Sequence, residues 1–312
     1  MKHQIYDKTE DMSKAAAQII AKLINENNAF KNPDGTIGKP TVLGLATGNT
    51  PIGVYDELAR MHERHEVDFS RVITFNLDEY WGKDWEDKPI DENHDESFRK
   101  YMNDKLFNRV GITPDRVNFL DGTIGINETD EAVREKLIDD HCKAYQAKIR
   151  EVGGIDLQLI GIGQNGHFAF NEPKFNALTL PDGDTTFSRS SGTRKVRLTA
   201  STQNANPKRP SNEALTMGMN DIMKCRRVLQ IASGDAKAEA IYGALLAPYN
   251  PELWPSSVLR FHDDYTIMMA EGAQSKVVEK LSQEPDTKIE SAALESYLAR
   301  RRTPTVPSQT AR

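Results

Sequence analysis

Apolar residues follow two patterns along this chain. Short apolar runs, which are typical of buried strands, cover residues 41–46, 72–77, 117–120, 157–162, 227–232 and 265–270. Apolar residues at helical spacing cover residues 9–27, 51–65, 98–107, 128–152, 236–246, 275–283 and 289–301. Strands and helices alternate through most of the sequence, which is typical of parallel sheets. We therefore predict an α/β fold with an open, mostly parallel sheet and helices on both faces, the Rossmann-like, doubly wound arrangement.

The longest predicted helix, residues 128–152, would begin after Asn127, whose side chain is suited to cap a helix. Its inner face is expected to carry the apolar and aromatic residues Ala132, Leu137, Ile138, Tyr145 and Ile149. No repeat or linker divides the chain, so residues 1–302 are predicted to form one domain.

Two stretches without clean periodicity resemble inserted loops: residues 81–93, which are acidic and contain two tryptophans, and residues 174–193. Long loops in compact domains often serve as lids or binding loops. The polar residues 303–312 are expected to form a disordered tail.

The composition fits an ordinary globular protein and argues against several classes. The 312 residues are 38% hydrophobic and 28% charged, with a net charge of −6. Without a basic stripe, nothing indicates a nucleic-acid partner. The N-terminus has no apolar core of a signal peptide and no stretch is long enough to span a membrane, so we expect a cytoplasmic protein. Cys142 and Cys225 are expected to be buried free thiols.

The segment GIGQNGHFAFNEP (161–173) carries the strongest chemical signal. It follows a predicted strand, and open α/β sheets place their chemistry at such carboxyl ends. Asn165, His167 and Glu172 form one candidate group, because histidine can shuttle protons and a carboxylate would orient it if the chain turns back. A structural histidine in a glycine loop explains these residues equally well. The segment also contains GxGxxG, but Pro173 leaves little room for the helix that a nicotinamide site requires.

A second strand end continues as GLATGNTP (44–51). Backbone amides at the following helix N-terminus, together with the helix dipole, would suit an anion such as phosphate. A helix that is capped by Asn49 or Thr50, with Pro51 in its first turn, is the equally good alternative.

Other charged candidates are weaker when each is taken alone. Asp78 and Glu79 follow the second predicted strand, where one of them could abstract a proton, but most such pairs are simply solvated. Lys237 lies in a strand-to-helix turn, and Lys208 and Arg209 lie in a polar loop. For each of these cations a solvated surface charge is the alternative.

Several motifs resemble those of one family when they are taken together: GLATGNTP (44–51), ITFNLDEY (73–80), GIGQNGHFAFNEP (161–173), LTMGM (215–219) and SGDAKAEAI (233–241). Over roughly residues 44–269 the chain resembles the glucosamine-6-phosphate deaminases, or isomerases, within the superfamily of sugar-phosphate isomerases and 6-phosphogluconolactonases. The lactonases typically continue differently after the shared Gly-His, in a GHTASLFP-like sequence.

The resemblance implies a role for each candidate. Asp78 matches the base that moves a proton between C2 and C1 of the open-chain sugar. His167 matches the ring-opening catalyst, and Glu172 matches the carboxylate that holds it. The implied phosphate site consists of Thr47, Gly48, Asn49, Thr50 and Lys237. The implied reaction converts glucosamine 6-phosphate and water into fructose 6-phosphate and ammonia, with neither a metal nor a redox cofactor.

Three features depart from the family pattern. Asn165 stands where many members carry an aspartate, and an asparagine orients an imidazole without supplying a charge. The expected phosphate-binding arginine aligns loosely with Lys208 or Arg209, and a lysine would lose bidentate geometry. The loops 81–93 and 174–193 exceed the usual family length and flank the implied site.

Several alternatives therefore stay open. Galactosamine 6-phosphate or another hexose phosphate is a second substrate class, because the loops could reshape the pocket. A 6-phosphogluconolactonase-type hydrolase is disfavoured by Asp78 and by the residues after His167. A non-catalytic sugar-phosphate sensor has only Asn165 in its support. Relatives range from monomers to hexamers, so the resemblance leaves a homo-oligomer open.

Overall fold

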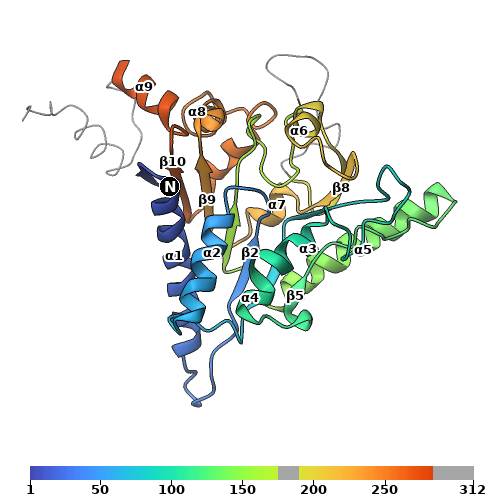
Figure 1. Cartoon of the computed structure of the whole chain (residues 1–312), viewed down its shortest axis with the longest axis horizontal. Helices are drawn as coiled ribbons and strands as arrows, with labels where there is room; N and C mark the ends of the chain where they lie inside the picture. The colour runs from blue at the N-terminus through green and yellow to red at the C-terminus, as the bar shows by residue number, and fades with distance from the viewer. Residues whose placement is uncertain (175–189, 284–312) are drawn as a thin grey trace, which may run out of the picture.

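A parallel seven-stranded sheet forms the centre of the protein (Figure 1), in a computed structural model that describes residues 1–174 and 190–283. The strand order is β1-β10-β9-β6-β2-β3-β5, and every neighbouring pair is parallel. The strands are β1 (Lys2–Tyr6), β2 (Val42–Leu45), β3 (Ile73–Asn76), β5 (Val117–Asn118), β6 (Leu157–Ile160), β9 (Val228–Ser233) and β10 (Tyr265–Ala270). The predicted α/β fold with a mostly parallel sheet is confirmed.

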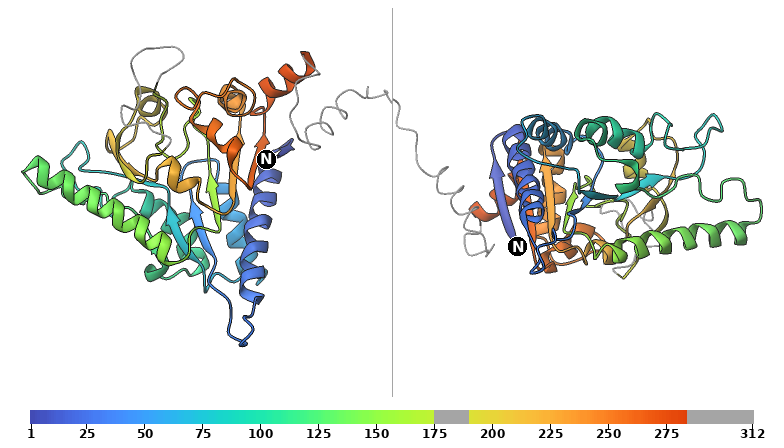
Figure 2. Two further views of the ribbon diagram at one scale, coloured as in Figure 1. Left: turned by 180° about the vertical axis from the view of Figure 1, so that it is seen from behind. Right: turned by 90° about the horizontal axis from the view of Figure 1, so that it is seen from below.

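Helices cover both faces of this sheet, as Figure 2 shows from two sides. One face carries α1 (Thr9–Ala29), α2 (Ile52–Glu63), α3 (Phe98–Met102), the short π-helix η1 (Asn103–Phe107) and α4 (Asn108–Val110). The other carries α5 (Glu131–Glu151), α8 (Ala238–Leu245) and α9 (Ser275–Gln283). Alternate side chains of each strand point to opposite faces, so Leu43 packs with α1 and α2, whereas Val42 packs with the opposite cluster.

A small antiparallel sheet lies beside the large one, and the sequence patterns did not predict it. It has the order β4-β8-β7, formed by β4 (Asp78–Tyr80), β8 (Glu213–Thr216) and β7 (Arg194–Arg197). The helix α6 (Ala200–Ala205) joins β7 to β8, and α7 (Met219–Ile222) follows β8. Strands of three or four residues are too short to show a period in sequence.

Other element predictions need correction. Strand β1 was missed because KHQIY contains no apolar run, although it pairs along the edge of the sheet with β10. Helix α5 begins at Glu131 and is capped by Asp130, whose carboxylate accepts from two backbone amides, so Asn127 is not the cap. Ala132 and Leu137 are exposed rather than on the inner face.

Some predictions fall partly or wholly outside the described residues: most of the loop 174–193, the helix 289–301 and the tail 303–312. Both Cys142 and Cys225 are buried free thiols, as expected. Among the described helices, none combines the length and apolar character needed to cross a membrane.

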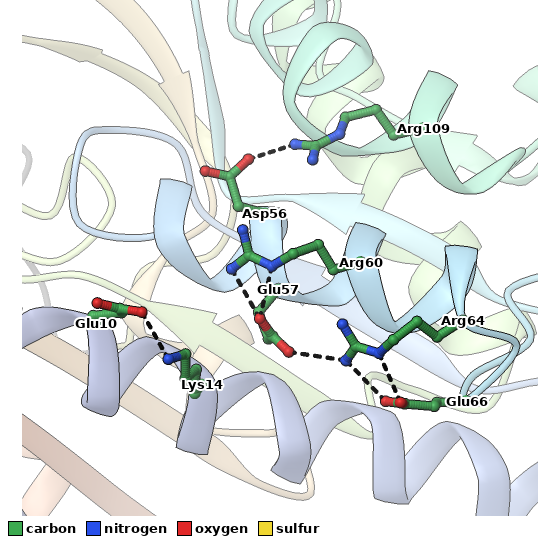
Figure 3. Close-up of polar contacts among 8 residues, drawn as sticks. All are labelled: Glu10, Lys14, Asp56, Glu57, Arg60, Arg64, Glu66 and Arg109. Carbon is green, nitrogen blue, oxygen red and sulfur yellow. Dashed lines mark hydrogen bonds and ion pairs between the residues drawn. The ribbon is translucent and has the colours of Figure 1, made fainter.

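Helix α2 begins at one of the candidate sites, and its ion pairs include one that joins it to a neighbouring helix (Figure 3). Asp56 pairs with Arg109 of α4 at 2.5 Å, which joins the two helices. Glu57, whose side chain is only 13% exposed, accepts from Arg60 and Arg64. Exposed pairs contribute at most about 1 kcal/mol each, so the buried face of α2 supplies most of its stability.

Candidate active site

Four adjacent strands supply the candidate residues. Strands β9, β6, β2 and β3 are neighbours in the parallel sheet, so their carboxyl ends lie along one edge. The segments that follow these strands carry Lys237, the 161–173 loop, the 46–51 loop and Asp78, respectively. Residues that are up to 190 positions apart in sequence are thereby placed along one edge of the sheet.

His167 lies in the loop after β6 and is oriented through one ring nitrogen. Its Nδ1 lies 2.6 Å from Oδ1 of Asn165, 3.3 Å from Oε2 of Glu172 and 3.4 Å from Oγ1 of Thr202. The other nitrogen, Nε2, makes no hydrogen bond to any described residue, and the side chain is 19% exposed. One nitrogen is therefore held by the protein, and the other is available to a ligand.

Asn165 links His167 to Glu172. Its Nδ2 donates to Oε2 of Glu172 at 2.9 Å, and this carboxylate also accepts from Thr199 at 3.1 Å. A carboxylate only accepts, so the amide oxygen of Asn165 must face the imidazole and accept from Nδ1–H. This arrangement leaves a lone pair on Nε2 of His167, the state that a general base requires.

Glu172 is completely buried, yet it stays ionised. Burial raises the pKa of this carboxyl, but the nearby imidazole of His167 and the hydrogen bonds of the surrounding polar side chains, among them that from Asn165, outweigh it, so the net shift of the pKa is downward. The chain turns back to place Glu172 here through a tight turn in which Ala169 adopts a positive φ of 47°. Strained residues of this kind cluster at functional sites.

Two glycines allow the histidine loop to form. A Cβ atom at Gly163 would lie 2.2 Å from Cε1 of His167, so only glycine leaves space for the imidazole. Gly166 has a φ of +83° and packs against Trp254, and its carbonyl accepts from Ser256. These contacts explain the second and third glycines of the pattern that imitates a dinucleotide motif.

Asp78 is a buried residue that opens β4, two positions after the end of β3. Asp78 is 6% exposed, and no described residue donates a hydrogen bond to its carboxyl group. Burial and the adjacent Glu79 raise the pKa of Asp78 to about 8. A carboxyl with a pKa near the working pH is suited to both accept and return a proton.

Glu79 points away from Asp78, and hydrogen bonds within the protein hold its carboxyl group. It accepts hydrogen bonds from the hydroxyl of Ser97 and from the backbone amides of Phe98 and Arg99, at the N-terminus of α3. Burial raises the pKa of Glu79 to about 7 in spite of these bonds. Of the two adjacent acids, Asp78 is therefore the one whose carboxyl receives no hydrogen bond from the described residues.

The small antiparallel sheet joins Asp78 to the histidine loop. Asp78 lies opposite Thr216 in the β4–β8 pair. The hydroxyl of Thr216 accepts from the backbone amide of Phe170 at 3.0 Å, and Asn171 donates to the carbonyl of Met217 at 2.9 Å. Through β8, the candidate base and the candidate ring-opening histidine are held in one rigid framework.

The loop after β2 presents unused backbone amides. No described residue accepts a hydrogen bond from the amides of Gly48, Asn49 or Thr50, which precede α2. Neither Asn49 nor Thr50 caps the helix with its side chain, so the capped-helix interpretation is wrong. Tyr101 of α3 donates its hydroxyl to the carbonyl of Gly48 at 2.6 Å, and Tyr55 likewise holds the carbonyl of Ala46.

The three candidate cations differ in what surrounds them. Lys237 has no partner among the described residues, and burial lowers the pKa of its ammonium group. Lys208 is exposed and also has no described partner. Arg209 uses Nε, Nη1 and Nη2 on neighbouring oxygens of Asn212 and Gln203. Lys237 and Lys208 are therefore free to meet an anion, whereas Arg209 is engaged in its own loop.

Sequence reasoning missed Thr199 and Thr202, which contact Glu172 and His167. The available signal was the spacing Thr-x-x-Thr, because Thr199 is also the N-cap of α6 and accepts from the amide of Thr202. Tyr101 was missed as well, because nothing in sequence connects α3 with the 46–51 loop.

Comparisons with known proteins agree on one family. The family model described as glucosamine-6-phosphate isomerases/6-phosphogluconolactonase matches residues 7–268. The chain is 38% identical to glucosamine-6-phosphate deaminase of Thermoanaerobacter sp. (strain X514) over 275 residues, which covers 86% of this chain and 92% of the relative. It is 36% identical to the deaminase of Clostridium acetobutylicum, with 85% and 95% covered.

Solved structures give the same result. A monomeric glucosamine-6-phosphate deaminase superposes with a TM-score of 0.71 at 33% identity, over 88% of this chain and all of that protein. A 6-phosphogluconolactonase from Leishmania guyanensis superposes with a TM-score of 0.63 at 20% identity, over 88% of this chain and 98% of that protein. The second likeness concerns the fold alone.

Proposed function

This chain belongs to the family of glucosamine-6-phosphate isomerases and 6-phosphogluconolactonases, and we propose that it converts glucosamine 6-phosphate and water into fructose 6-phosphate and ammonia. One observation carries the choice of deamination over lactone hydrolysis. A buried carboxyl, Asp78, with a pKa raised to about 8, is fixed through β8 to the loop that holds His167. Proton transfer between adjacent sugar carbons needs such a base to remove a carbon-bound proton, whereas water attack on a lactone removes none.

Ring opening is the first step and is assigned to His167. Its free Nε2 accepts the proton of the anomeric hydroxyl and returns a proton to the ring oxygen as the C1–O5 bond breaks. Asn165 accepts from Nδ1–H throughout, so the imidazole keeps its orientation as it gains and loses the proton. The ionised Glu172 stabilises the transient positive charge across the amide of Asn165.

Isomerisation follows at C1 and C2 and is assigned to Asp78. The C1 aldehyde acidifies the proton on C2, which the carboxylate removes to give an enolamine. The same carboxyl returns a proton to C1, so the nitrogen-bearing carbon becomes an imine at C2. Water adds to this imine and ammonia leaves, which yields the ketose. The proton that O1 gains as the aldehyde becomes a hydroxyl matches the proton that the nitrogen releases as the imine forms, so the sequence balances without an external oxidant or reductant.

The substrate phosphate is assigned to the loop of Thr47, Gly48, Asn49 and Thr50. Its unused amides and the N-terminus of α2 favour an anion. Lys237 and Lys208 supply the positive charge, because neither has a described partner. Phosphosugar is thus the proposed partner of the site. A cytoplasmic location and a homo-oligomer stay predictions.

The test is release of ammonia and fructose 6-phosphate from glucosamine 6-phosphate, with Asp78→Asn and His167→Gln beside the wild type. We expect at least a 100-fold loss of kcat in each variant, the lower end for a general acid–base group. Asp115→Asn, a change at an exposed carboxylate of the 114–116 turn, is the matched control and should match the wild type. Full turnover by Asp78→Asn would refute the assignment of the base.

Two parallel substrates separate the alternatives. Turnover of galactosamine 6-phosphate alone would keep the mechanism and change the substrate. Hydrolysis of 6-phosphogluconolactone without ammonia release from either amino sugar would identify a hydrolase. Binding of phosphosugar without turnover of any of the three would identify a sensor.

A further inference from the structure

The 81–93 loop is a folded element rather than a loose insertion. Oδ1 of Asp84 accepts from the backbone amides of Glu86 and Lys88, each at 2.8 Å, and a β-bridge joins Lys83 to Pro89. Ile90 is 1% exposed and anchors the returning chain. The loop therefore has a fixed shape from which a side chain can be presented.

That side chain is Trp85, which is 66% exposed. Its indole N–H donates to the backbone carbonyl of Arg209 at 2.9 Å, and the guanidinium of Arg209 lies 6.0 Å from the centre of the ring. The neighbouring Trp81 is buried and donates to Ile124 instead. A core role thus explains Trp81, but no core role explains the exposed Trp85.

Trp85 fixes the segment that carries Lys208. This segment is held from two other sides, because Arg209 donates to Gln203 and Asn212, and Asn206 donates to the hydroxyl of Tyr80 at 3.0 Å. It also continues directly from α6, whose Thr202 contacts His167. Lys208 is the member of the segment whose charge is unused.

We propose that Trp85 is a positioning residue for substrate phosphate, and that it acts by holding the backbone beside Lys208 so that this ammonium group faces the phosphate. The proposal rests on the proposed function, because it takes phosphosugar as the ligand. A backbone that is fixed before binding loses less freedom when the lysine engages the anion. The long 81–93 loop then contributes to recognition of the substrate, so changes in it should alter KM rather than kcat.

The experiment compares Trp85→Ala, Trp85→Phe, Lys208→Met and the double variant Trp85→Ala/Lys208→Met in the ammonia-release assay. Phe261→Ala is the matched control, because Phe261 is also 66% exposed but lies far along the chain beside Tyr249. We expect Lys208→Met to raise KM about 10- to 100-fold, as for loss of a charged hydrogen bond. Trp85→Ala and Trp85→Phe should raise KM about 3- to 10-fold, with kcat within 2-fold, on the scale of one neutral hydrogen bond.

The double variant decides the mechanism. If Trp85 acts through Lys208, the double variant has the KM of Lys208→Met alone, whereas multiplied effects would overturn the proposal. A wild-type KM in Trp85→Ala, or in Lys208→Met, would also overturn it. If the wild type releases no ammonia, the proposed function fails, and calorimetric titration with inorganic phosphate still tests the inference. Weaker phosphate binding by Trp85→Ala than by Phe261→Ala supports it, and equal binding overturns it.

Discussion

Replacing Asp78 with asparagine should remove activity and stabilise the protein, and both effects follow from one buried group. The carboxyl of Asp78 has no described hydrogen-bond donor, and burial together with Glu79 raises its pKa from 3.8 to about 8. The ionised form is therefore disfavoured in the folded protein relative to the unfolded chain. Asparagine has nearly the same shape as a protonated aspartate and cannot ionise.

The sign and size of the stability change follow from the linkage between protonation and folding. Between pH 3.8 and about 8 the folded protein keeps a proton on Asp78 that the unfolded chain has released. The free energy of unfolding of the wild type therefore falls as pH rises, by about 1.4 kcal/mol per pH unit for this group. The stability that the protonated carboxyl contributes is complete below pH 3.8 and is lost by about pH 8. Asp78→Asn does not lose stability in this way, because asparagine does not titrate.

The assay is urea unfolding of both proteins at pH 5, 6 and 7. We expect the stability advantage of Asp78→Asn to grow by roughly 3 kcal/mol from pH 5 to pH 7. Glu79 titrates in both proteins, and because its pKa is raised mainly by burial, most of its contribution cancels from the difference. An advantage that stays constant with pH would show that Asp78 ionises freely in the folded protein. The same pKa predicts that kcat/KM of the wild type rises with pH up to about 8.

Three further predictions concern other positions. Tyr101→Phe removes the hydroxyl that holds the carbonyl of Gly48, so KM for glucosamine 6-phosphate should rise about 5-fold with little change in kcat, as steady-state kinetics would show. Gly163→Ala would place a Cβ 2.2 Å from the ring of His167, and we expect kcat to fall at least 10-fold in the ammonia assay while far-UV circular dichroism stays unchanged. Burial and the N-terminal charge lower the pKa of His3 from 6.5 to about 4, so protonation opposes folding as pH falls through this range. His3→Leu should reduce the loss of unfolding free energy between pH 6.5 and 4 by roughly 3 kcal/mol in urea titrations; an unchanged pH dependence would refute this reasoning.

The sequence predicted the parallel sheet well, because the central strands are mostly buried and mostly apolar. It predicted the small sheet poorly, because β4, β7 and β8 are short and β4 pairs with β8 across more than a hundred residues. Strand β1 was missed for a related reason, since KHQIY has only one strongly apolar residue. The capping error at α5 arose because Asn127 and Asp130 are both suitable N-caps, and only the backbone geometry selects Asp130.

The residues of the candidate site likewise differ in how well the sequence predicted them. Their positions after predicted strands and the motif resemblance led to Asp78, His167 and Glu172, and the fold places them beyond the carboxyl ends of β3 and β6, which lie on either side of β2. Sequence left Lys208 and Arg209 equivalent, because both are cations in one polar loop. Only the hydrogen bonds of Arg209 distinguish them. Contacts such as that of Thr202 with His167 depend on how α6 packs, which no local pattern reports.

The neutral side chain of Asn165 avoids adding another negative charge to the candidate site. Asp78, Glu79 and Glu172 are already buried carboxyl groups, and two of them have pKa values raised by burial. An aspartate at position 165 would bring a carboxylate oxygen to within about hydrogen-bond distance of Oε2 of Glu172, where the amide of Asn165 now donates at 2.9 Å. Like charges at such a distance force one group to take up a proton. The neutral amide avoids this repulsion, keeps Glu172 ionised and still accepts from His167, so an aspartate at position 165 is not required for histidine orientation in this protein.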